Sequence, residues 1–113
     1  MTAKRINITK KPWGYEQILS QNDKYVIKRI AIFRGKRLSL QYHEKKQETM
    51  YINSGTGIIQ VGDIEQKFGH EDIFEIEPDV IHRITAITYT EILEVSTPEL
   101  DDIIRIEDDY GRA

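Results

Sequence analysis

A chain of 113 residues suits a single domain and is too short for two independent ones. Hydrophobic residues make up 39% of it and charged residues 31%, a balance typical of a globular protein rather than a disordered chain. The formal net charge of -3 argues against a nucleic-acid binder, although a few local arginines or lysines can still hold a small anion. The absence of cysteine excludes disulfides and thiolate chemistry, so any metal has to bind histidine, carboxylate and amide ligands.

The N-terminal residues carry no apolar segment of the kind found in signal peptides. Nowhere does the sequence approach ~20 consecutive apolar residues, the length that a membrane-spanning helix needs. We therefore expect a cytoplasmic protein that does not enter a membrane. We also expect residues 1–10 to form an arm ahead of the folded domain.

From residue 25 onwards the sequence is a succession of short segments in which β-branched and aromatic residues alternate with polar ones. Glycine, asparagine, aspartate and charged residues separate these segments, and Gly62-Asp63 is typical of a hairpin turn. No long helix is indicated before residue 98, so the pattern predicts an all-β sandwich or barrel, with a jelly roll as the natural form for eight strands. The predicted strands are residues 25–33, 37–43, 48–55, 56–62, 64–68, 73–77, 81–87 and 90–96.

The C-terminal segment, residues 98–113, contains signals for both a helix and a strand. Asp101 and Asp102 are suitable for a helix start, but "IIRIE" alternates as a strand does. We expect a short strand or an irregular tail packed on the barrel.

The stretch "GKRLSLQYHEKKQE", residues 35–48, contains the residues with the clearest chemistry. In a strand, Gln41 and His43 point to the same side, and Glu48 opens the next predicted strand. His82, in "PDVIHRI", is a suitable fourth ligand from a distant strand. Two imidazoles, one carboxylate and one amide oxygen suit Zn, Mn, Fe(II), Co or Ni better than Ca or Mg. The spacing alone also fits an exposed polar turn, and a lone His82 also fits a hydrogen-bonded histidine.

The order Gly35, Gln41, His43, Glu48, Gly55 resembles the cupin motif, with glutamine in place of its first histidine. The segments "KPWGYE", "GKRLSLQYH", "IHR" and "RIEDDYGR" follow in the same order as in the cupin domain of type II phosphomannose isomerases. The resemblance spans about residues 11 to 112. It implies one cupin domain over residues 1–113, folded as a double-stranded β-helix or jelly-roll barrel.

The same resemblance implies function. It assigns one divalent metal ion, zinc first and Mn, Fe, Co or Ni as alternatives, to the ligand set Gln41, His43, Glu48 and His82. It gives catalytic roles to Arg83 and Arg112, and implies a homodimer that isomerises mannose 6-phosphate and fructose 6-phosphate through a cis-enediol. Its expected partner is thus a small phosphorylated sugar, with no nucleic acid and no membrane.

Several points stay open at this stage. Arg83 follows His82 directly, so in a regular strand its side chain points to the opposite face. Trp13 fits a packing anchor better than a sugar-stacking platform, and His70 looks like a loop residue. The stretch "EKKQ", and "EPDVIH" before His82, depart from the family pattern and leave the substrate uncertain. The alternative functions are an oxygenase, a sugar epimerase of polysaccharide biosynthesis, or a sugar-binding cupin without catalysis.

Overall fold

The computed structural model describes residues 7–113, and within that range all regular secondary structure is β-strand. No helix of the described residues is long and apolar enough to cross a membrane. The strands are β1 (Thr9–Lys11), β2 (Gly14–Gln21), β3 (Val26–Ile32), β4 (Leu40–Tyr42), β5 (Glu48–Ser54), β6 (Gly57–Val61), β7 (Ile64–Phe68), β8 (Ile73–Ile76), β9 (His82–Ala86), β10 (Thr90–Ser96) and β11 (Ile104–Glu107).

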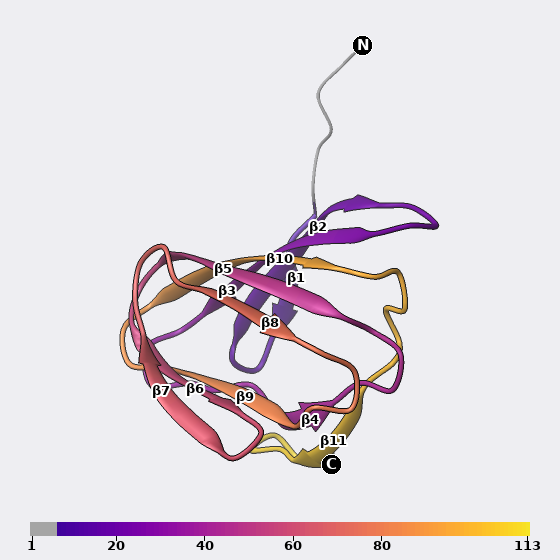
Figure 1. Ribbon diagram of the computed structural model, residues 1–113. Helices are drawn as coiled ribbons and strands as arrows, with labels where there is room; N and C mark the ends of the chain where they lie inside the picture. Colours follow the sequence, from indigo (N-terminus) through magenta and orange to yellow (C-terminus); the bar gives the residue numbers. More distant parts are fainter. Residues whose placement is uncertain (1–6) are drawn as a thin grey trace.

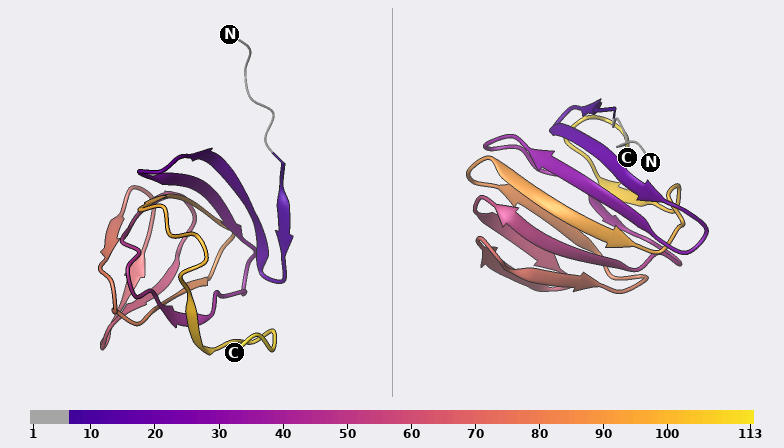
Figure 2. Two further views of the ribbon diagram at one scale, coloured as in Figure 1. Left: turned by 90° about the vertical axis from the view of Figure 1, so that its right-hand side faces the viewer. Right: turned by 90° about the horizontal axis from the view of Figure 1, so that it is seen from above.

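The strands form two antiparallel sheets that face each other (Figure 1). One sheet has six strands in the order β1-β2-β3-β10-β5-β8, and the other has five in the order β11-β4-β9-β6-β7. Figure 2 shows the strands of the larger sheet running side by side across one wall of the barrel. This arrangement confirms the expected all-β jelly roll.

The core between the sheets is built mainly from isoleucine. β-branched side chains suit a pleated surface, and each fully buried one stabilises the fold by roughly 1.5–3 kcal/mol. Both sheets contribute fully buried isoleucines, so the core packs the two sheets together. The fully buried isoleucines are Ile32, Ile52, Ile59, Ile76, Ile84 and Ile92.

The predicted strands from residue 25 to residue 96 are all present, with ends that differ by no more than a few residues. The Gly62-Asp63 turn connects β6 and β7, with Val61 directly opposite Ile64 and Gly62 at a φ of 61°. The hairpin of β1 and β2 was not predicted, because β2 carries mixed polar and apolar residues on both faces. Residues 1–6 of the expected N-terminal arm lie outside the described residues, and Thr9 and Lys10 belong to β1.

The C-terminal segment resolves as a strand. β11 pairs with β4, placing Arg105 opposite Gln41 and Ile104 opposite Tyr42. The tail is therefore an edge strand of the five-stranded sheet, and it ends beside β4 (Figure 1).

Gly57, the first residue of β6, tests how tightly the barrel is packed. A Cβ atom there would lie 2.1 Å from the carbonyl oxygen of Thr85 and 2.5 Å from the ring of Phe68. We expect Gly57→Ala to lower the free energy of unfolding by roughly 1–3 kcal/mol, the cost of overpacking a core. Urea denaturation measures this. Gly69→Ala is the matched control, since nothing lies within 4 Å of its added Cβ; equal stability of the two variants would contradict the prediction.

Candidate metal centre

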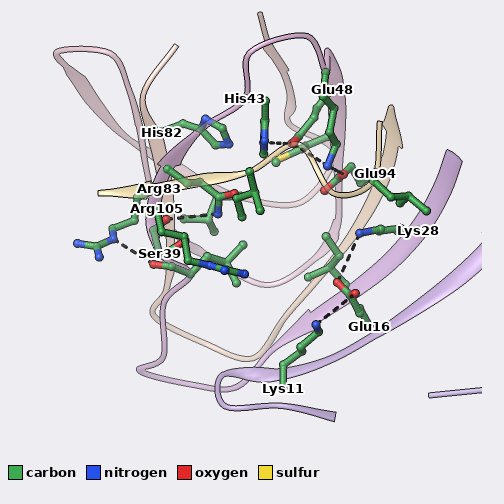
Figure 3. Close-up of a pocket in the computed structure, with 18 of the residues that line it drawn as sticks. Lys11, Glu16, Lys28, Ser39, His43, Glu48, His82, Arg83, Glu94 and Arg105 are labelled. Carbon is green, nitrogen blue, oxygen red and sulfur yellow. Dashed lines mark hydrogen bonds and ion pairs between the residues drawn. The ribbon is translucent and has the colours of Figure 1, made fainter. Parts of the chain in front are cut away.

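Three of the four predicted ligands meet inside the barrel. His43 directly follows β4, Glu48 opens β5 and His82 opens β9, and their ligand atoms all lie within 4.8 Å of one another. The three residues are only 2–3% exposed. Figure 3 shows the two imidazoles and the carboxylate pointing toward one another. The sequence pattern therefore predicted a real cluster and not an exposed polar turn.

Both histidines are oriented by backbone carbonyls. Nδ1 of His43 lies 2.5 Å from the carbonyl oxygen of Asp102, and Nδ1 of His82 lies 2.9 Å from that of Val80. Because a carbonyl only accepts hydrogen bonds, each Nδ1 carries the proton and each Nε2 keeps a free lone pair. That is the tautomer a metal ligand needs, fixed by the partner of the other ring nitrogen.

Gln41 lies in β4 directly opposite His82 of β9. Its Nε2 donates to the carbonyl oxygen of Ser39 at 3.4 Å, and its side chain borders the same cavity as the two histidines. The amide donor is thus directed to the backbone, which leaves the amide oxygen available to a metal ion.

A divalent cation fits this cluster. Nε2 of His43 lies 2.5 Å from Oε1 of Glu48, yet neither this nitrogen nor Oε2 of Glu48 has a well-aligned hydrogen bond. A free nitrogen lone pair and a carboxylate oxygen repel each other at that distance unless a cation or a proton lies between them. Two imidazoles with one carboxylate and one amide oxygen form a donor set typical of zinc and its first-row neighbours.

The protonation states also fit metal binding. Burial opposes ionisation of Glu48, but its close contact with the His43 imidazole and the charge of Lys46 outweigh burial and lower its pKa to about 2. Burial lowers the pKa of His82 below its usual value, and the attraction of Glu48 offsets only part of that effect. At neutral pH the site thus offers an ionised carboxylate and a neutral His82 imidazole.

The loop between His43 and Glu48 is held by Asp102. The carboxylate of Asp102 accepts hydrogen bonds from the backbone N–H groups of Glu44, Lys45 and Lys46 at 3.0, 2.7 and 2.9 Å. These hydrogen bonds lower the pKa of Asp102 to about 2. The C-terminal segment therefore fixes both the His43 ring and the loop that leads to Glu48.

A second buried charge pair lies next to the ligands. Nζ of Lys46 is 3.1 Å from Oε1 of Glu48 and 3.4 Å from Oε1 of Glu94, on β10. Lys46 and Glu94 are 5% and 4% exposed. Neither residue was singled out from the sequence. For Glu94 a signal existed, because it occupies an inward position in the alternating segment "TEILEVS".

The four predicted ligands border a cavity of about 480 Å³. At some distance from them, Glu16 lies between Lys11 and Lys28, with a lysine Nζ 3.7 Å from each of its two carboxylate oxygens (Figure 3). Trp13, 5% exposed, packs in the core and also borders the cavity, as a packing anchor does. His70 lies in an exposed turn away from the site.

Arg105 is a further cavity residue that the sequence analysis did not single out. It lies opposite Gln41, which itself lies opposite His82, so the three residues form a row across β11, β4 and β9. Its Nε is buried without a hydrogen-bond partner, and among residues 7–113 no carboxylate forms an ion pair with it. The guanidinium is thus available to an anion in the cavity.

The two arginines predicted to be catalytic are both engaged. Arg83 donates from Nε to the carbonyl oxygen of Leu38 at 3.0 Å and forms an ion pair with Glu107 at 3.2 Å. Its side chain reaches away from the ligand cluster (Figure 3), as strand alternation predicted. Arg112 borders the cavity and forms a two-point ion pair with Asp108, with distances of 2.8 and 3.0 Å.

Comparison with known sequences gives one consistent result. A family model described as mannose-6-phosphate isomerase C-terminal matches residues 2–108. The xanthan biosynthesis protein XanB of Xanthomonas campestris is 32% identical over 107 residues, and a mannose-1-phosphate guanylyltransferase of Escherichia coli K12 is 31% identical over 108. Each match covers 90% of this chain but only 23% and 22% of the relative, so the chain spans less than a quarter of the curated relatives it matches.

Solved structures share the fold at low sequence identity. KdgF from Halomonas sp. superposes with a TM-score of 0.79 at 14% identity, covering 84% of this chain and 90% of that protein. An RmlC-like cupin from Shewanella frigidimarina gives 0.77 at 17% identity, covering 87% and 88%. These likenesses concern the backbone fold alone.

Metal binding provides the first test of the site. We expect Zn²⁺ to raise the melting temperature of the protein, and Glu48→Gln to weaken Zn²⁺ affinity by more than the roughly 10–100-fold that loss of a supporting contact costs. Affinity should also fall as the pH drops below the lowered pKa of His82, because only neutral imidazole binds metal. Thermal denaturation measures the change in melting temperature, and calorimetric titration measures the two effects on affinity. His70→Ala is the control; a Glu48→Gln protein that binds like wild type would rule out the ligand set.

Asp102 provides a pH test. Its folded-state pKa of about 2 lies below the ordinary value of 3.8, so its contribution to stability is present above pH 3.8 and is lost as the pH falls toward 2. We expect metal-free Asp102→Asn to be less stable than wild type at pH 5 and to approach wild type near pH 2. Urea denaturation across this range, with Asp101→Asn as control, measures the difference. A difference that is constant with pH would contradict the assignment.

Proposed function

Because the chain belongs to the mannose-6-phosphate isomerase C-terminal family and has a cupin fold, we propose that it is a metal-dependent isomerase of mannose 6-phosphate and fructose 6-phosphate. The observation that carries the proposal is the row Arg105, Gln41 and His82, which places a free guanidinium in the same cavity as a buried metal-ligand cluster. A phosphorylated sugar needs both a cation for its phosphate and a centre that polarises its hydroxyl and carbonyl oxygens.

In this proposal Gln41, His43, Glu48 and His82 hold one divalent ion, with zinc as the first candidate. When bound, such an ion acts as a Lewis acid toward sugar oxygens and stabilises the negative charge that develops during enolisation. With Glu48 as the one anionic ligand, the occupied centre keeps a net positive charge, which suits that role.

The chain's own residues then position the substrate. Arg105 binds the phosphate, for which a guanidinium offers several donors in a planar fork. Arg112 contributes a second cation if the phosphate displaces Asp108 from it. A group of the chain must also carry the proton between C1 and C2, and the cavity-lining carboxylates outside the ligand set are the candidates. These are Glu16, Glu94 and Asp101.

Arg83 enters the proposal as a positioning residue. Its guanidinium connects the segment at Leu38 with the side chain and the carbonyl oxygen of Glu107, which ends β11. Arg83 therefore fixes the strand on which Arg105 lies, without facing the substrate.

The expected homodimer concerns assembly, and a single chain does not address it. It stays a prediction that sedimentation analysis can check.

A coupled isomerase assay on metal-loaded protein tests the function. We expect turnover of mannose 6-phosphate, and for Arg105→Gln a roughly 10–100-fold higher KM, because a hydrogen bond to a charged group contributes about 1.5–3 kcal/mol. Arg29→Gln is the matched control, since Arg29 lies in the same fold but pairs with Gln17 and Glu91 away from the cavity.

The outcomes separate the alternatives. No turnover with Zn²⁺, Mn²⁺, Fe²⁺, Co²⁺ or Ni²⁺ would reject the isomerase, and oxygen uptake by the Fe(II) protein would favour an oxygenase. Saturable binding of sugar phosphate without turnover would indicate a binding protein. An unchanged KM in Arg105→Gln would reject the phosphate contact alone.

A further inference from the structure

Lys46 and Glu94 form a buried charge pair that the metal-ligand set does not explain. Lys46 lies in the loop between His43 and Glu48, and Glu94 lies on β10. Burying an ammonium and a carboxylate in an apolar barrel costs free energy, and well-packed apolar residues often serve stability equally well. The position of the Lys46–Glu94 pair beside the predicted ligands therefore indicates a role at the site.

Lys46 is shared between two carboxylates. Its Nζ lies 3.1 Å from Oε1 of Glu48 and 3.4 Å from Oε1 of Glu94. Oε1 of Glu48 is the same oxygen that lies 2.5 Å from Nε2 of His43. The ammonium thus contacts the same carboxylate oxygen that faces His43, and a metal ion bound through this oxygen would compete with Lys46 for it.

Glu94, like Glu48, has a buried carboxylate oxygen without a hydrogen bond. It is 4% exposed, and its Oε1 has no well-aligned hydrogen bond despite the nearby ammonium. A buried acceptor without a hydrogen bond is costly, so a shift of Lys46 toward Glu94 would stabilise the protein on that side. The short 3.1 Å contact with Glu48 opposes this shift for as long as no other cation neutralises Glu48.

We propose that Glu94 is a counter-charge that receives Lys46 when a metal ion takes its place on Glu48. With both carboxylates ionised and no metal bound, the single ammonium of Lys46 leaves a net charge of -1 on the trio. A divalent ion on Glu48 repels Lys46, and Glu94 is the group that can hold it. Glu94 is thus a positioning residue that sets metal affinity without being a ligand.

The proposal predicts effects of opposite sign. Removing the charge of Glu94 leaves Lys46 with Glu48 alone, so Glu94→Gln should weaken Zn²⁺ binding about tenfold, the size expected for one partly screened buried charge. Removing the ammonium leaves two carboxylates without a cation, so Lys46→Met should tighten Zn²⁺ binding by a similar factor. In the double variant Lys46→Met/Glu94→Gln both charges are gone, and affinity should return to within a few-fold of wild type.

Calorimetric titration with Zn²⁺ measures these affinities, and chelator competition extends the range. Glu91→Gln is the matched control for Glu94, because it lies on the same strand and pairs with Arg29 on the other face of the sheet. Lys45→Met is the control for Lys46, because Lys45 is exposed. Both controls should bind like wild type.

Two results would overturn the proposal. One is a Glu94→Gln protein that folds like wild type by circular dichroism and binds Zn²⁺ as tightly, which would make the pair purely structural. The other is a double variant as weak as Glu94→Gln. The inference rests on the metal site of the proposed function but not on the isomerase reaction. A protein that binds Zn²⁺ but does not turn over mannose 6-phosphate would therefore reject the reaction only. The Zn²⁺ affinities of the variants would still test the role of Glu94.

Discussion

The ionised carboxylate of Glu48, buried between two apolar sheets, is the constraint on which the rest of the structure depends. A charge in such a place is tolerated only when other groups compensate it. On one side His43 and His82 face it, and on the other side Lys46 approaches it. The barrel core itself is built mainly from isoleucine, which supplies no compensating charge. Because these groups compensate the charge of Glu48 only in part, the site still attracts a cation. The free-energy cost of burying Glu48 thus favours metal binding.

The C-terminal segment is the part of the chain that stabilises this arrangement from outside the core. Asp102 fixes the ligand loop through three backbone N–H groups and orients His43 through its carbonyl oxygen. From the last residue of β11 onwards, three consecutive acids each form an ion pair with an arginine, so this acidic run makes specific contacts. The pairs are Glu107 with Arg83, Asp108 with Arg112 and Asp109 with Arg37. Two of these contacts hold the tail to the rest of the domain, through Arg83 on β9 and Arg37 ahead of β4, and so keep Arg105 beside the cavity; the Asp108–Arg112 pair lies within the tail itself.

Most of the strands could be predicted from the sequence. The inward-facing residues that could not be predicted depend on how the strands pair with one another. Alternation of apolar residues predicted the strands between residues 25 and 96, because one face of each strand lies on an apolar core. It did not predict β2, whose faces meet polar cavity residues such as Lys28 as well as the core. The cluster of His43, Glu48 and His82 was predicted because residue types and motif order mark these positions. Arg105 and Lys46 were not, because an arginine in a tail and a lysine in a charged loop carry no local sign of facing inward.

Strand parity decides which arginine can serve the cavity. His82 and Arg83 are neighbours in β9, so once His82 faces the barrel interior, Arg83 has to leave through the other face of the sheet. A cation on the ligand side must then come from another strand whose register matches that of His82. The pairing of β9 with β4 places Gln41 there, and the pairing of β4 with β11 places Arg105 next in the row. A slip of one residue between β4 and β11 would exchange Arg105 for the apolar Ile104 or Ile106. The contacts that fix the tail therefore also determine whether the metal-ligand cluster has a guanidinium beside it.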